Sequence, residues 1–154
     1  MNKDEEHLHE GGKYPSILPQ LVVQTLVNGK KASTHIDNGS DSQFISISFA
    51  HQHNIPLIPL AKSKHLGLAD GQLARHSRIT HGAILDVTIS DDTHAQHHEQ
   101  LVVFVADVQH DLVLGRPWLA AHQPQIRWRS GTIVMDSPHS VSYTHLTLPT
   151  ILRV

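Results

Sequence analysis

The feature that most constrains the fold is a pair of extended runs joined by a tight turn. Residues 21–27 are rich in Val, Leu and Thr, and apolar residues alternate with polar ones over 31–36. Asn28-Gly29 lies between the two runs, and this dipeptide is a strong signal for a β-hairpin. A second Asn-Gly pair follows Asp37 and cannot continue a strand. The pattern therefore predicts that Asp37 lies where a hairpin strand ends.

The remaining sequence predicts further short strands and very little helix. One short helix is expected after a cap at Ser46 or Ser48, and another begins near Pro117, because proline suits the first helical turn. Residues 90–99 are polar and are expected to form a loop. Short runs rich in β-branched or apolar residues are typical of strands. They fall at residues 64–69, 73–79, 84–89, 101–106, 112–114, 125–128 and 132–135.

Length and composition exclude several classes of protein. A chain of 154 residues is long enough for one domain with a modest core. Its formal net charge of -2 argues against nucleic acid or an anionic membrane as the main partner. The absence of cysteine excludes a disulfide scaffold and a thiolate zinc site. No apolar run is long enough to span a bilayer, so we expect a soluble cytoplasmic protein.

The two ends of the chain differ from its centre. Residues 1–16 are mostly polar and include Gly11-Gly12, which predicts a disordered lead-in. Residues 17–138 are expected to form the folded domain. Residues 141–154 fit none of the preceding pattern, and 141–150 read codon by codon like a transposase adaptor used in sequencing libraries. We interpret this tail as an artefact rather than a β segment, although its Thr, Leu and Val would suit a strand.

Four separated blocks resemble one known family in order and spacing. They are residues 37–46, 68–71, 110–119 and 125–133, of which HDLVLGRPWL at 110–119 is the most specific. Together they resemble the retropepsin-like aspartic protease domain of gypsy-type LTR retrotransposon (Gag-Pol) polyproteins. The resemblance covers residues 21–135. It implies an all-β fold, a small closed barrel with short helices, forming one lobe of a homodimer.

The resemblance also implies roles for particular residues. Its catalytic group would be Asp37, and it requires no metal and no other cofactor. The rest of the implied site consists of the active-site loop Asn38, Gly39 and Ser40, the flap tip Ala69, Asp70 and Gly71, and the loop-supporting strand Leu112, Val113, Leu114 and Gly115.

The chemistry of peptide hydrolysis explains why such a site needs two chains. Two carboxyl groups within hydrogen-bond distance share one proton, so the pair supplies a base to activate water and an acid for the carbonyl oxygen. A single chain offers one suitable acid, and the second would be Asp37 of an identical chain. Asp41 is the internal rival, but loop acids usually stabilise turns. The substrate would be a polypeptide, namely extended apolar segments of its own polyprotein, with neither nucleic acid nor membrane as partner.

One departure from the family pattern affects the expected activity. The family has Ser or Thr after the aspartate, and its hydroxyl links the two loops across the dimer; here the residue is Asn38. An amide is longer and needs partners for both its donor and its acceptor. We therefore expect a weakened site. The alternative is a degenerate or domesticated module that keeps the dimeric fold and binds without catalysis.

Fifteen histidines raise the alternative of a metal site. His94, His97 and His98 lie close together in the sequence, and His51 and His53 form a second group. Zinc needs three or four ligands held in a rigid, convergent arrangement. Because residues 90–99 are expected to form a loop, we interpret these histidines as solvated and expect no metal there.

Overall fold

The structure is a computed structural model that describes residues 17–67, 73–91 and 93–135. The predicted lead-in at 1–16, the flap tip at Ala69, Asp70 and Gly71, and the tail at 141–154 lie outside the described residues. The helices are α2 (Ile47–Gln52) and α3 (Arg116–His122). The strands are β1 (Val22–Val27), β2 (Lys30–Ile36), β3 (Phe44–Ser46), β4 (Ile58–Gly67), β5 (Leu73–Ser90), β6 (Gln96–Ala106), β7 (Leu112–Leu114), β8 (Gln125–Arg127) and β9 (Thr132–Val134).

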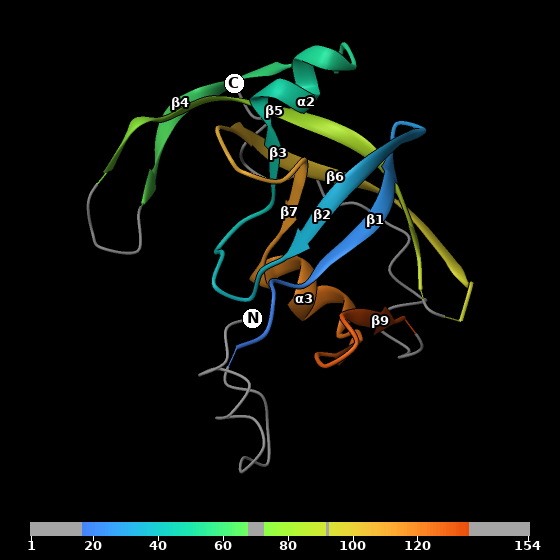
Figure 1. Cartoon of the computed structure of the whole chain (residues 1–154). Helices are drawn as coiled ribbons and strands as arrows, with labels where there is room; N and C mark the ends of the chain where they lie inside the picture. Colours follow the sequence, from blue (N-terminus) through green and yellow to red (C-terminus); the bar gives the residue numbers. More distant parts are fainter. Residues whose placement is uncertain (1–16, 68–72, 92, 136–154) are drawn as a thin grey trace.

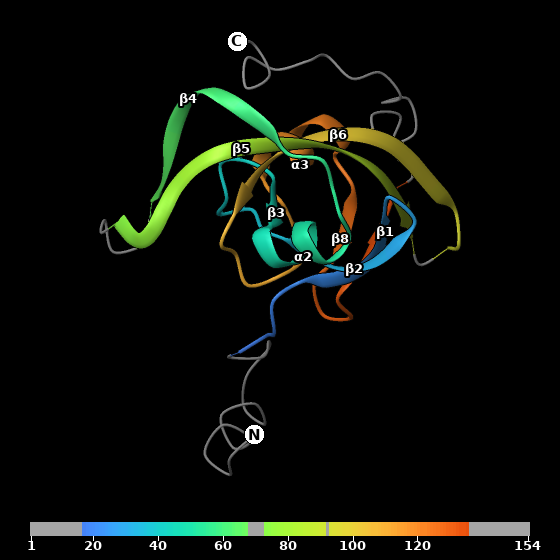
Figure 2. The ribbon, with the colours of Figure 1, turned by 90° about the horizontal axis from the view of Figure 1, so that it is seen from above.

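Six of the strands form a closed barrel. The sheet has the order β1-β2-β7-β3-β6-β5-β4, and β1 also pairs with β5, which closes the ring. The seventh strand, β4, pairs only with β5, and the two extend away from the barrel as a long arm (Figures 1 and 2). Strands β8 and β9 form a separate small hairpin. The predicted all-β barrel with short helices is confirmed.

The β1–β2 hairpin forms as predicted and also helps to close the barrel. Asn28 and Gly29 both have positive φ, 50° and 79°, as a tight two-residue hairpin turn requires. The Asn28 side-chain oxygen accepts a hydrogen bond from the backbone N–H of Asp86 on β5, at 2.8 Å. The backbone N–H of Asn28 donates to the Asp86 carbonyl, also at 2.8 Å. The turn therefore ties β1 to β5, the two strands whose pairing closes the barrel.

The interior of the barrel is filled by the inward faces of its strands. On β5, Leu85, Val87 and Ile89 alternate with more exposed residues and are fully buried. Strand β6 lies between β3 and β5, which agrees with the apolar character of residues 101–105 on both faces of the strand. Burial of this apolar surface is the main stabilising contribution to the fold.

The prediction of a loop over residues 90–99 is wrong. Strand β5 is continuous from Leu73 to Ser90, and β6 begins at Gln96, so a short turn joins two long paired strands. Asp91 organises this turn, because its Oδ1 accepts hydrogen bonds from Thr93 and from the backbone N–H of Ala95. The polar character of the segment misled the prediction, since its inward-facing polar residues are buried and paired with distant partners.

Both short helices have identifiable ends. Ser46 caps α2, with its hydroxyl accepting a hydrogen bond from the backbone N–H of Phe49 at 3.0 Å. Helix α3 has Pro117 in its first turn, as predicted, and ends at Gln123 in the left-handed conformation. No helix among the described residues is both long and apolar enough to cross a membrane.

Candidate active site

Asp37 lies at the end of β2, beside the end of β7. The two strands are parallel, with Ile36 opposite Leu114. The backbone N–H of Asp37 donates to the Leu114 carbonyl at 2.9 Å, so the pairing continues one residue beyond β2. Gly115 follows Leu114 directly. Thus the acid and this glycine stand side by side where two neighbouring strands stop.

The turn after Asp37 holds its carboxylate while leaving it accessible. The backbone N–H of Gly39 donates to Asp37 Oδ1 at 2.9 Å, and the Ser40 N–H donates to the Asp37 carbonyl at 3.1 Å. The Asp37 side chain remains 36% exposed. One carboxylate oxygen is therefore fixed by a backbone amide, and the other, Oδ2, lies 4.0 Å from His35 Nδ1. Asn38 and Asp41 are exposed on the same loop.

Gly115 is buried against the loop that carries Asp37. A Cβ at this position would lie 2.3 Å from the Ser42 carbonyl oxygen and 2.7 Å from that of Ser40. The next backbone N–H, from Arg116, donates to the Ser40 carbonyl at 2.8 Å. Only a residue without a side chain permits this approach. The glycine therefore lets the start of α3 support the acid loop.

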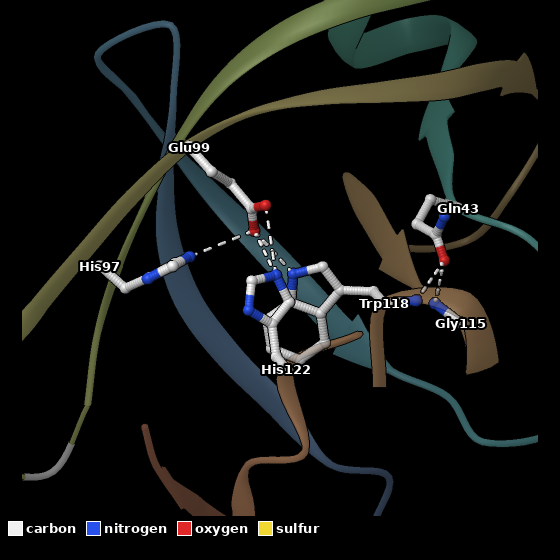
Figure 3. A network of polar contacts seen from close by, with 6 residues as sticks. All are labelled: Gln43, His97, Glu99, Gly115, Trp118 and His122. Carbon is white, nitrogen blue, oxygen red and sulfur yellow. Dashed lines mark hydrogen bonds and ion pairs between the residues drawn. The ribbon is translucent and has the colours of Figure 1, made fainter. Parts of the chain in front are cut away.

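Gln43, which the sequence analysis did not single out, joins the same two segments. Its side-chain oxygen accepts hydrogen bonds from the backbone N–H groups of Gly115, at 3.3 Å, and Trp118, at 3.2 Å (Figure 3). These groups belong to the first turn of α3, where backbone donors have no partner within the helix. Gln43 thus caps the N-terminus of α3 from a loop that is distant in the sequence. No local sequence pattern reveals such a cap.

A buried polar network anchors Trp118 and His122 of α3 to β6. Glu99 Oε1 accepts a hydrogen bond from the Trp118 indole N–H at 2.8 Å, and His122 Nε2 lies 2.9 Å from the same oxygen. His97 Nε2 points at it from 3.5 Å (Figure 3). Burial alone would raise the pKa of Glu99, but the imidazoles of His122 and His97, with the Trp118 indole, lower it to about 2. A buried carboxylate with these partners stays ionised.

The same network is the one group among the described residues whose donor set could hold a metal. The ligand atoms of His97, Glu99 and His122 lie within 4.8 Å of one another. His94 and His98, which the sequence placed beside His97, are exposed and take no part. The Glu99 carboxylate already accepts N–H donors in this arrangement. The geometry therefore fits a hydrogen-bonded network that locks α3 onto the barrel.

A pocket of about 460 Å³ opens over Asp37. Its lining includes Lys64 and His65 from β4 and Ile79 from β5, so the base of the β4–β5 arm forms one wall. Asp37 and Arg116 contribute from the opposite side, at the end of β2 and the start of α3. The space beside the acid is thus enclosed by elements that are far apart in the sequence.

Two histidines flank the acid within this pocket. His35 Nδ1 lies 4.0 Å from Asp37 Oδ2, and the His35 and His110 ring centroids are 5.0 Å apart. Burial lowers the pKa of His35; the Asp37 carboxylate opposes this change and His110 adds to it. The position of His35 beside Asp37 could be predicted from the sequence, because residues two apart along a strand lie on the same face.

Comparison with solved structures shows which class of protein this architecture defines. The retroviral protease-like domain of Ddi1 from Leishmania major matches 79% of this chain and 91% of its own, with a TM-score of 0.57 and 18% identity. The EIAV protease, solved with an inhibitor, matches 71% of this chain and 92% of its own, with a TM-score of 0.50 and 14% identity. The fold is therefore that of the retropepsin-like proteases, as the sequence resemblance implied.

The family follows from the sequence itself. Residues 33–143 match the family model of the PEG10/RTL1 protease domain, which is well over half of the chain. The chain belongs to the PEG10/RTL1 protease domain family.

Proposed function

We propose that this protein is an aspartic endopeptidase in which Asp37 from two identical chains forms the catalytic pair. The observation that carries the proposal is the placement of Asp37. Its carboxylate is partly exposed, held on one side by the Gly39 amide, and faces a pocket large enough for part of a peptide. Membership of a protease-domain family supports the same chemistry.

The reaction would proceed through an activated water molecule. One carboxylate of the pair removes a proton from water, while the protonated carboxyl donates to the carbonyl oxygen of the scissile peptide. The two groups share one proton because two adjacent carboxylates cannot both stay ionised. Asn38, Gly39 and Ser40 would shape the loop around the pair, and residues 112–115 would support it from below.

The second acid would come from a partner chain rather than from this one. Asp41 is the nearest alternative in the sequence, but it is exposed beyond the turn. Asp37 lies at the mouth of an open pocket, so a symmetric partner could bring its own Asp37 alongside. A homodimer is therefore part of the proposal.

The substrate would be an extended polypeptide. The arm formed by β4 and β5 borders the pocket, and its tip, at Ala69, Asp70 and Gly71, would cover the substrate as a flap. An extended peptide can add strand-like hydrogen bonds to such a hairpin and present alternate side chains to pockets. In the gypsy-type retrotransposon context that the sequence resembles, the substrate would be the polyprotein that contains this domain.

A cleavage assay tests the proposal. The purified full chain is incubated with an unstructured protein at mildly acidic pH, beside Asp37→Ala and Asn38→Ser variants. We expect fragments from the unaltered chain, more from Asn38→Ser, and none from Asp37→Ala. Equal digestion in all three, or no digestion by either the unaltered chain or Asn38→Ser, would contradict the enzyme assignment.

A further inference from the structure

We propose that the pocket over Asp37 binds an acidic side chain of the substrate, so that cleavage occurs beside a glutamate or aspartate. The inference rests on the proposed function, since it assigns a substrate class to the same pocket. For the substrate side chain nearest to Asp37, we therefore propose an acidic residue in place of the apolar residue expected from the sequence.

The balance of ionisable groups in the pocket favours an anionic ligand. Its acids are Asp37 and Asp41, of which the first would share a proton with its twin in the proposed dimer. The groups that carry positive charge or can donate an N–H hydrogen bond outnumber them, and they come from four separate parts of the chain. They are His35 on β2, Lys64 and His65 on β4, His110 before β7 and Arg116 at the start of α3.

The permanent cations of the pocket have no carboxylate partner among the described residues. Lys64 Nζ lies 4.5 Å above the Phe104 ring, which is a favourable contact that leaves its charge without an anion. The backbone of Arg116 supports the acid loop, whereas its side chain is exposed at the pocket. A substrate carboxylate would supply the missing counter-charge.

His35 and His110 lie closest to the reacting group. The 4.0 Å separation between His35 Nδ1 and Asp37 Oδ2 is too long for a hydrogen bond, so this nitrogen can still bind a second carboxylate. The position of His110 is fixed, because its Nε2 lies 2.9 Å from Gln20 Oε1. Both rings are half-buried, and hydrogen bonds to an ionised group are strong where water is excluded.

The rest of the lining distinguishes an acidic residue from a purely apolar one. Phe44, Ile79 and Val108 form an apolar wall that suits the methylene groups of a glutamate. An apolar side chain in the same place would displace water from the cations and histidines without replacing its hydrogen bonds, which is unfavourable. The combination of apolar wall and basic groups therefore selects a carboxylate on a short aliphatic stem.

The test measures binding separately from cleavage. Fluorescent peptides that are identical except for Glu, Gln or Leu at each position in turn are titrated into the Asp37→Asn chain, and Kd is read by anisotropy. At one position we expect Glu to bind about tenfold more tightly than Gln or Leu. His35→Leu and Lys64→Met should reduce this ratio, whereas the control His51→Gln, on α2 outside the pocket, should preserve it.

The outcomes distinguish this inference from the proposed function. Equal affinity for Glu and Gln at every position overturns the acidic subsite, even if the unaltered chain cleaves both peptides. A preference for Glu that survives both His35→Leu and Lys64→Met overturns the assignment to this pocket. A preference that depends on these residues, with no cleavage by the unaltered chain, supports the subsite and contradicts the endopeptidase.

Discussion

At the scale of single residues, the site depends on how closely Gly115 approaches the acid loop. In Gly115→Ala the new Cβ would meet the backbone carbonyl oxygens of Ser42 and Ser40, which cannot move independently of the loop. We expect a loss of about 3 kcal/mol in the free energy of unfolding, measured with urea. The control is Gly29→Ala, where the space is open but φ is +79°, and which costs about 1 kcal/mol. An equal or smaller loss in Gly115→Ala would contradict the proposed packing.

A second residue-scale prediction concerns Asn38. In the proposed dimer, this exposed amide must satisfy both its donor and its acceptor at the junction of the two loops. One unsatisfied buried group costs about 1 to 3 kcal/mol, so Asn38→Ser should tighten the dimer about tenfold. Sedimentation over a dilution series measures this change, with Asn38→Ala as the control that lacks any donor. No tightening in Asn38→Ser would count against the predicted role of this position.

At the scale of elements, helix α3 is fixed at its first turn by Gln43 and through its buried residues Trp118 and His122 by Glu99. The pKa of Glu99 in the folded state is about 2, below its ordinary value of 4.5. A group with a depressed pKa stabilises the fold above its ordinary pKa, and this contribution is lost as the pH falls towards the folded value. The relevant window therefore runs from pH 4.5 down to about 2.

The matched variant for this network is Glu99→Gln. At pH 7 we expect it to be less stable than the unaltered chain by about 3 kcal/mol, and this gap should narrow as the pH falls through the window. Urea unfolding at pH 7, 4 and 3 measures the gap between the two proteins. A gap that is constant with pH would show that the Glu99 carboxylate does not stabilise the fold in its ionised form.

Elements were predicted well where local pattern decides them. Asn28-Gly29 specified the first hairpin, and Pro117 specified the start of α3, because both residues restrict their own backbone. The segment 90–99 failed for a different reason. Glu99 and His97 are buried because Trp118 and His122 pack against them. The two hydrogen-bond partners of Glu99, Trp118 and His122, lie 19 and 23 residues further along the chain. A burial that depends on a distant partner leaves no periodic signal in the segment itself.

At the scale of the whole molecule, the barrel places residues that are far apart in the sequence around one pocket. The position of Asp37 at a strand end could be read from the turn that follows it. The pocket could not, since Lys64, His110 and Arg116 become neighbours only when β4, β7 and α3 have packed. Gln43 was missed for the same reason, because its partners belong to a helix more than 70 residues away.

In the proposed dimer each chain supplies half of the catalytic pair, and a subunit-mixing experiment tests this arrangement. Increasing amounts of Asp37→Ala chain are added to a fixed amount of unaltered chain, and the rate of peptide cleavage is measured. We expect the rate to fall, because mixed dimers hold a single catalytic aspartate, while an equal addition of unrelated protein leaves the rate unchanged. A cleavage rate that stays constant as the Asp37→Ala chain is added would contradict this arrangement.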